Sequence, residues 1–199
     1  MIDRIGLFLL ETFTPDWLKR RLARGRGLTP VQRWALAAGA QLTEMNDSRH
    51  DTLNPEPTAD TSDWRSGLEQ WWEVTGREEL LDRLHWLESS GHRQKFKEAL
   101  GHEPLAWDLV RYINLVRWGF GARFLQEAEA WQFILRVAPR LEAAYDSWGA
   151  MARDYILARN EWAGGVDPAL VRVTERLLDP ENKRSPWQQM PWPVSRALN

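Results

Sequence analysis

A long apolar stretch near the middle of the chain carries the strongest pattern in the sequence. Between Pro104 and Trp118 only four positions are polar or charged: Asp108, Arg111, Asn114 and Arg117. A helix that is apolar nearly all round is typical of the centre of a bundle, because none of its faces is suited to water. The sequence therefore predicts a central helix over this stretch, ended by Gly119 and Gly121.

Capping residues and apolar spacing predict further helices on both sides of this stretch. Thr29-Pro30 and Asp167-Pro168 each place an N-cap residue before a proline, which is typical of a helix start. Two apolar stripes follow helical spacing: Trp64, Leu68 and Trp71, and Trp148, Met151, Tyr155 and Trp162. No segment alternates as a strand does. The pattern predicts an all-α fold, a compact bundle of about seven to ten helices around the central one.

Three segments depart from the bundle pattern. Residues 46–62 are rich in Asp, Asn, Pro, Thr and Ser and are expected to form a loop. Residues 180–199 are expected to form an extended tail whose tryptophans and prolines pack on the bundle. Residues 1–28 form an amphipathic basic segment, which we expect to be helical and to precede a single helical domain over residues 29–199.

Composition narrows the function classes. The chain has 13 tryptophans, which predicts a tryptophan-rich core, and it has no cysteine. The lack of cysteine excludes disulfides, thiolate catalysis and cysteine-ligated zinc, and it fits a reducing cytoplasm. The formal net charge of −2 disfavours a nucleic-acid partner, since such proteins usually present a basic face.

A series of tryptophan-centred motifs is similar to a known family. The motifs are Thr29-Pro30-Val31-Gln32-Arg33-Trp34, Gly91-His92-Arg93, Ala106-Trp107-Asp108-Leu109, Arg117-Trp118-Gly119, Glu129-Ala130-Trp131, Ser147-Trp148, Ser185-Pro186-Trp187 and Pro191-Trp192. In this order they resemble the YbeU/YbeR-like family, an uncharacterised bacterial domain of unknown function. The resemblance runs from residue 28 to the end of the chain, and it implies a helical fold but neither an activity nor any site residue.

The polar positions of the central helix are the main candidates for a site. A buried charge needs a partner, and Asp108 and Arg111 at i, i+3 can pair. Arg159 lies on an apolar stripe, where it can stack on an aromatic ring or meet a carboxylate such as Asp108. We favour an internal polar network. The alternative is a pocket for an anionic or peptide ligand, formed by Asp108, Arg111, Asn114, Arg117 and Arg159 together with His92.

His92 lies at a break between two predicted helices, and we favour a capping or exposed role over a ligand-binding one. Metal ligation is weakly supported. His85 with Glu88, and Glu98 with His102, have helical spacing, but each helix offers only one such pair. The sequence therefore predicts no metal and no cofactor, and it points to no catalytic residue.

These observations favour a non-enzymatic interaction protein of the cytoplasm, of an immunity or regulatory kind, that binds a partner protein. Tryptophan and arginine are the residue types enriched at binding hot spots. The first alternative is an enzyme or small-ligand sensor with a polar pocket around Asp108, Arg111 and Arg159. The second is peripheral membrane association through residues 16–26, where a solvated helix face is the favoured interpretation.

Overall fold

The computed structural model describes residues 27–54 and 60–193 of the 199 in the chain. The predicted basic segment and the candidate membrane contact at 16–26 lie outside the described residues, apart from positions 27 and 28. The described residues contain helices and no strand, which confirms the all-α prediction. The helices are α3 Pro30–Ala38, α4 Ala40–Met45, α5 Thr61–Trp72, α6 Arg77–Ser89, α7 Arg93–Leu100, α8 Leu105–Gly121, α9 Glu127–Ala144, α10 Trp148–Ala163, α11 Pro168–Leu178 and α12 Pro186–Gln189.

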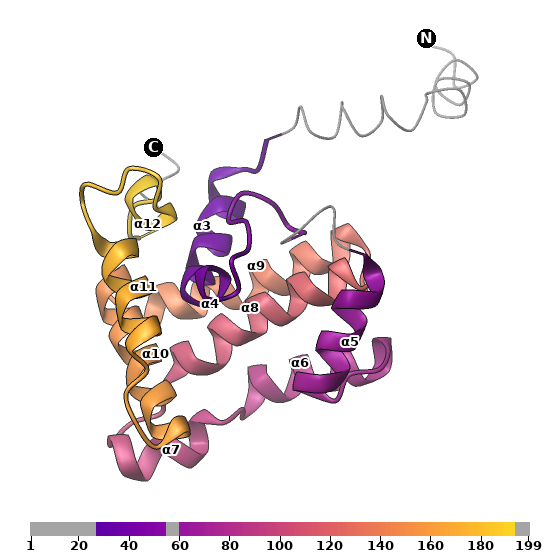
Figure 1. Cartoon of the computed structure of the whole chain (residues 1–199), viewed down its shortest axis with the longest axis horizontal. Coiled ribbons are helices and arrows are strands. Elements are labelled where there is room, and N and C mark those ends of the chain that lie inside the picture. The colour runs from indigo at the N-terminus through magenta and orange to yellow at the C-terminus, as the bar shows by residue number, and fades with distance from the viewer. Residues whose placement is uncertain (1–26, 55–59, 194–199) are drawn as a thin grey trace.

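Helix α8 is the centre of the bundle, as the sequence predicted (Figure 1). Thirteen of its 17 residues are buried, and α9, α10 and α6 pack along it, with α4 and α5 on its remaining sides. Gly119 and Gly121 belong to the helix and do not stop it at residue 118. A Cβ at Gly119 would lie 2.4 Å from Leu80 Cδ2, and one at Gly121 would lie 3.0 Å from the Trp64 ring. These glycines allow close approach of α6 and α5 to α8.

The expected helix starts are present. Thr29 caps α3 in a reciprocal pair with Gln32, and Asp167 accepts hydrogen bonds from the first amides of α11. The loop predicted at 46–62 ends earlier, because Asp60 caps α5 and Thr61 is its first residue. No helix among the residues described has both the length and the apolar character needed to cross a membrane.

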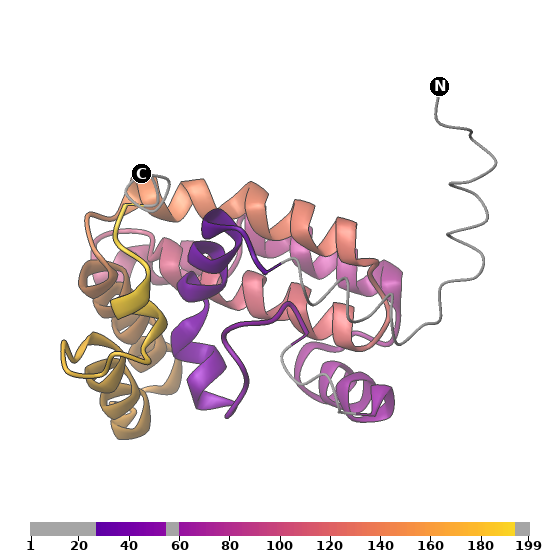
Figure 2. The same ribbon diagram turned by 90° about the horizontal axis from the view of Figure 1, so that it is seen from above.

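The C-terminal segment packs on the bundle through a cluster of four tryptophans. Trp187 stacks on Trp148 with the ring planes 6° apart, and its Nε1 donates to the Ala37 carbonyl oxygen at 2.7 Å. Trp192 meets Trp148 edge-on, and Trp34 contacts both of these rings. The segment is not extended throughout, since Pro186–Gln189 forms one helical turn, α12. Figure 2 shows this turn beside α3 and α11.

The tail cluster can be tested by replacing Trp187 with alanine. Trp187 is 4% exposed, so Trp187→Ala should lower the free energy of unfolding by about 3–5 kcal/mol in urea denaturation. Trp71 is 76% exposed, and Trp71→Ala should change the free energy by no more than about 0.5 kcal/mol. Equal effects of the two substitutions would contradict the packed position of the tail.

Candidate functional site

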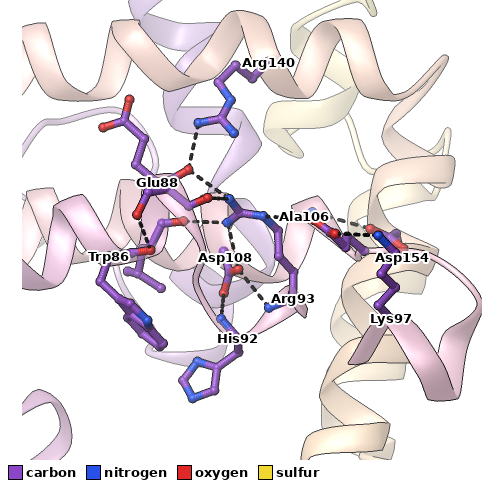
Figure 3. A network of polar contacts seen from close by, with 12 residues as sticks. Trp86, Glu88, His92, Arg93, Lys97, Ala106, Asp108, Arg140 and Asp154 are labelled. Carbon is purple, nitrogen blue, oxygen red and sulfur yellow. Dashed lines mark hydrogen bonds and ion pairs between the residues drawn. The ribbon is translucent and has the colours of Figure 1, made fainter. Parts of the chain in front are cut away.

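Asp108 is the centre of a buried polar network that joins α8 to the start of α7 (Figure 3). Its side chain is fully buried. Oδ1 accepts from the amide of His92 at 3.0 Å, and Oδ2 accepts from the amide and the Nη1 of Arg93 at 3.1 and 3.0 Å. Burial raises the pKa of the Asp108 carboxyl, and these donors act in the opposite direction by favouring its ionised form.

Arg93 connects this carboxylate to the end of α6. Its guanidinium also donates to the carbonyl oxygens of Leu87, Glu88 and Ser89, at 2.7, 3.0 and 2.6 Å. These carbonyls belong to the last turn of α6, where a helix has no internal donors left for them. Arg93 therefore ends one helix and neutralises the buried charge of another.

Gly91 allows the Asp108 carboxylate to approach the chain. Its φ is +58°, and a Cβ at this position would lie only 1.9 Å from Asp108 Oδ2. Both the left-handed backbone and the close approach require glycine here. The Gly91-His92-Arg93 motif thus forms the turn that binds the Asp108 carboxylate.

Arg111 pairs with Asp108 as the i, i+3 spacing suggested, but only at a long ion-pair distance. Its Nη1 lies 3.9 Å from Asp108 Oδ1 and 3.0 Å from His92 Nδ1. The guanidinium carbon lies over two indole rings, 4.7 Å from the centroid of Trp72 and 4.5 Å from that of Trp107. Burial and the neighbouring Arg111 lower the pKa of His92 to about 4, so His92 is neutral at pH 7 and accepts from Arg111.

Arg159 lies apart from Asp108. It stacks on Trp162 at 5.0 Å from the ring centroid, as expected, but its carboxylate partner is Asp167, at 3.1 Å. The Nη1 atom of Arg159 is buried and has no acceptor among the described residues.

Asn114 and Arg117 point into the core and hold α4 and the loop after it. Asn114 Nδ2 donates to the Gly39 carbonyl oxygen at 3.1 Å, and Arg117 Nη1 donates to Thr43 Oγ1 at 2.8 Å. The rest of the Arg117 guanidinium binds the carbonyl oxygens of Arg49, Thr52 and Leu53. Burial lowers the pKa of Arg117 to about 10. These two residues form a structural network, which matches the favoured interpretation of the sequence for this half of the helix.

A cleft of about 490 Å³ lies between α5, α8 and α10, next to the end of α4. Arg111 and Arg159 both line it, together with Tyr155, whereas Asp108, Asn114, Arg117 and His92 are not among its lining residues. The described lining consists of Leu42, Asn46, Ser48, Asp63, Trp64, Gly67, Leu68, Trp71, Trp72, Trp107, Arg111, Trp118, Tyr155, Arg159 and Trp162. Of the six predicted site residues, the structure thus brings two to one cleft.

Hydrogen-bond donors outnumber acceptors at the floor of this cleft. The Nε and Nη2 atoms of Arg111 donate to none of the described residues, and Trp107 Nε1 is buried without an acceptor among them. Burial raises the pKa of Tyr155 to about 12, so its hydroxyl is neutral and can donate. Asp63 is the one carboxylate among the described lining residues. The floor is therefore suited to a group that accepts hydrogen bonds.

The sequence did not predict that α5 forms one wall of the cleft, or that Arg93 binds Asp108 and the last carbonyl oxygens of α6. The stripes placed Trp71 and Trp162 towards the core, but these side chains are 76% and 56% exposed at the cleft. A signal was available, because Trp71 and Trp72 are adjacent and adjacent helix positions point about 100° apart. On a helix that buries only a narrow stripe, one of two such neighbours lies at or beyond the edge of the buried face.

Comparison with known proteins gives one partial match. Residues 99–192 match a family model described as "Protein of unknown function (DUF1266)". No curated protein and no solved structure matches the chain. The matched region contains α8 and α10, and so the floor and one wall of the cleft, whereas α5 precedes it. The match agrees with a domain of unknown function, and the more specific YbeU/YbeR-like assignment stays a prediction.

The turn that binds Asp108 can be tested with a pair of glycine substitutions. Gly91 and Gly101 both have positive φ, of +58° and +74°, but a Cβ at Gly101 would meet no atom within 4 Å. Gly101→Ala should cost only the backbone strain, about 1 kcal/mol. Gly91→Ala should cost at least about 2 kcal/mol more in urea unfolding, because it also displaces the buried carboxylate from its donors. Equal losses of unfolding free energy in Gly91→Ala and Gly101→Ala would contradict the proposed contacts of the Asp108 carboxylate.

The contact between His92 and Arg111 can be tested by NMR titration. His92 should titrate at about pH 4, and Arg111→Met should move its pKa upward, though burial should still hold it below 6.5. His102 is an internal control, since its hydrogen bond to Asp154 raises its pKa. Because the folded-state pKa of His92 is below the unfolded value, its contribution to stability is complete above about pH 6.5 and falls as the pH drops towards 4. A His92 midpoint at or above 6.5 would refute this contact.

Proposed function

We propose that the chain is a ligand-binding protein that holds an anionic molecule in the aromatic cleft. The observation that carries this proposal is Arg111, a guanidinium at the cleft floor. Its carboxylate partner among the described residues, Asp108, lies 3.9 Å away and accepts from closer donors. A cation that is largely removed from water is unfavourable unless an anion or a set of acceptors compensates it. An anionic ligand would supply that compensation.

The carboxylate nearest to Arg111, that of Asp108, already accepts hydrogen bonds from other donors. Asp108 accepts three hydrogen bonds at 3.0–3.1 Å from His92 and Arg93, whereas its distance to Arg111 Nη1 is 3.9 Å. Arg159, the second guanidinium of the cleft, differs in having Asp167 at 3.1 Å. Arg111 is therefore the position at which a ligand anion gains most.

The chemistry of the walls supports recognition of a ligand over the enzymatic alternative. The described lining offers indole faces, two guanidinium groups, a phenol of raised pKa and a single carboxylate, that of Asp63. Such groups bind and orient a molecule. The volume is also in the range of pockets for small molecules, about 300–1,000 Å³.

Binding of a partner protein is the second candidate function, and one observation favours it. Trp71 and Trp162 expose large apolar rings at the cleft, and exposed tryptophans are frequent hot spots of protein interfaces. The immunity or regulatory role and the cytoplasmic location expected from the sequence stay predictions.

The proposed function can be tested with the fluorescent carboxylate dye 2-anthroate. The folded protein should bind one equivalent, and Arg111→Met should weaken binding by at least about tenfold, because a charge-assisted contact of about 1.5–3 kcal/mol is lost. Arg111→Lys, which keeps the charge, should retain part of the affinity.

Arg172→Met is the matched control, since Arg172 is exposed on α11 and does not line the cleft. Circular dichroism and urea unfolding should show that each variant is folded. Dye binding that is unchanged in folded Arg111→Met, or equally weakened in Arg172→Met, would reject the cleft as an anion site.

A further inference from the structure

The geometry points to a planar aromatic carboxylate as the class of molecule that the cleft takes, an inference that rests on the proposed function. The carboxylate would meet Arg111 at the floor, and the aromatic rings would lie among the tryptophans beside Gly67. Three independent features support this assignment: the free edge of Arg111, the space at Gly67, and the indole faces of the walls.

The surroundings of Arg111 favour a flat anion. Because the Trp72 and Trp107 rings cover the guanidinium, an oxyanion must approach its N–H edge. The Nε and Nη2 atoms lie on one edge of the guanidinium, and they donate to no described residue. A carboxylate coplanar with the guanidinium can accept from both, in the bidentate geometry typical of arginine. A tetrahedral phosphate would place two further oxygens against the indole rings.

Gly67 provides room that the fold does not otherwise require. It lies inside α5, where glycine is less favourable than alanine, and it lines the cleft. A Cβ at this position would meet no atom within 4 Å, so close packing does not demand glycine, in contrast to Gly119 and Gly121. Its φ is also not among the positive ones. Space for a bound molecule explains the residue.

The walls are suited to aromatic rings. Indoles line the cleft from α5, α8 and α10, represented by Trp64, Trp107 and Trp162. Aromatic pairs contribute more than the burial of their area alone, which favours a flat, unsaturated ligand over a saturated one of equal size. Arg159 Nη1 and Trp107 Nε1 are buried donors without an acceptor among the described residues, and an oxygen substituent on the ring could satisfy one of them.

Isothermal titration calorimetry with four naphthalene derivatives tests this class directly. 2-Naphthoate carries both the rings and the carboxylate, decahydro-2-naphthoate lacks the aromatic rings, 2-naphthylmethanol lacks the charge, and 2-naphthyl phosphate carries a tetrahedral anion. We expect 2-naphthoate to bind with one-to-one stoichiometry, and each of the other three to bind at least about tenfold more weakly.

Substitutions at Gly67 test where the rings lie. Gly67→Leu should fill the space and weaken 2-naphthoate binding at least about tenfold, while its unfolding free energy stays equal or rises because leucine is the better helix former. Gly67→Ala, which adds one methyl group, should bind 2-naphthoate within about threefold of the unchanged protein and be as stable or more stable. Loss of affinity without loss of stability is a result that a purely structural glycine cannot give.

The outcomes separate this inference from the proposed function. If 2-anthroate binds in an Arg111-dependent way but 2-naphthoate binds no better than its saturated or phosphate analogue, the ligand class is wrong and the anion site stands. If 2-naphthoate binds equally well to Gly67→Leu, the rings do not lie beside α5 and the inference fails. If neither the dye nor 2-naphthoate binds, both proposals fail.

Discussion

The carboxylate of Asp108, buried in the central helix, determines how the surrounding polar groups are arranged. It needs donors, and Arg93 together with two backbone amides supplies them. This arrangement fixes the turn between α6 and α7, which in turn places His92 against Arg111. Because the oxygens of Asp108 are occupied by closer donors, Arg111 reaches this carboxylate only at 3.9 Å, and its other contacts are a neutral imidazole and two indole faces. The cationic floor of the cleft is thus a consequence of how a core charge is satisfied.

The helix geometry explains why the polar residues of α8 do not form one site. They recur every three residues, and three residues rotate an α-helix by about 300°, so that each side chain points about 60° away from the previous one. Asp108 therefore faces α7, Arg111 faces the cleft, and Asn114 and Arg117 face α4 and its loop. Between Asp108 and Arg117 the direction changes by about 180°. A shared pocket would have required a spacing of three and four in alternation.

The sequence predicted those parts of the structure that depend on local chemistry. The apolar stretch identified α8, and threonine and aspartate before proline identified the starts of α3 and α11. Which residues pair with the charged side chains depends on tertiary packing, and the local pattern could not predict it. Arg93 belongs to the Gly91-His92-Arg93 motif, in which only His92 had been considered as a candidate, and Arg159 meets Asp167 across a turn. The stripe on α5 indicated burial, yet Trp71 lies at the cleft.

A double-mutant cycle on Asp108 tests the central claim most directly. The coupling free energy of Asp108→Asn with Arg93→Gln, measured by urea unfolding, should be at least about 2 kcal/mol, because the pair is buried and in direct contact. The coupling of Asp108→Asn with Arg111→Gln should be below about 1 kcal/mol. The distance between these two side chains is longer, and the Asp108 oxygens already accept hydrogen bonds from His92 and Arg93. An equal or larger coupling with Arg111 would show that Asp108 is as much the counter-ion of Arg111 as of Arg93, and would contradict the account.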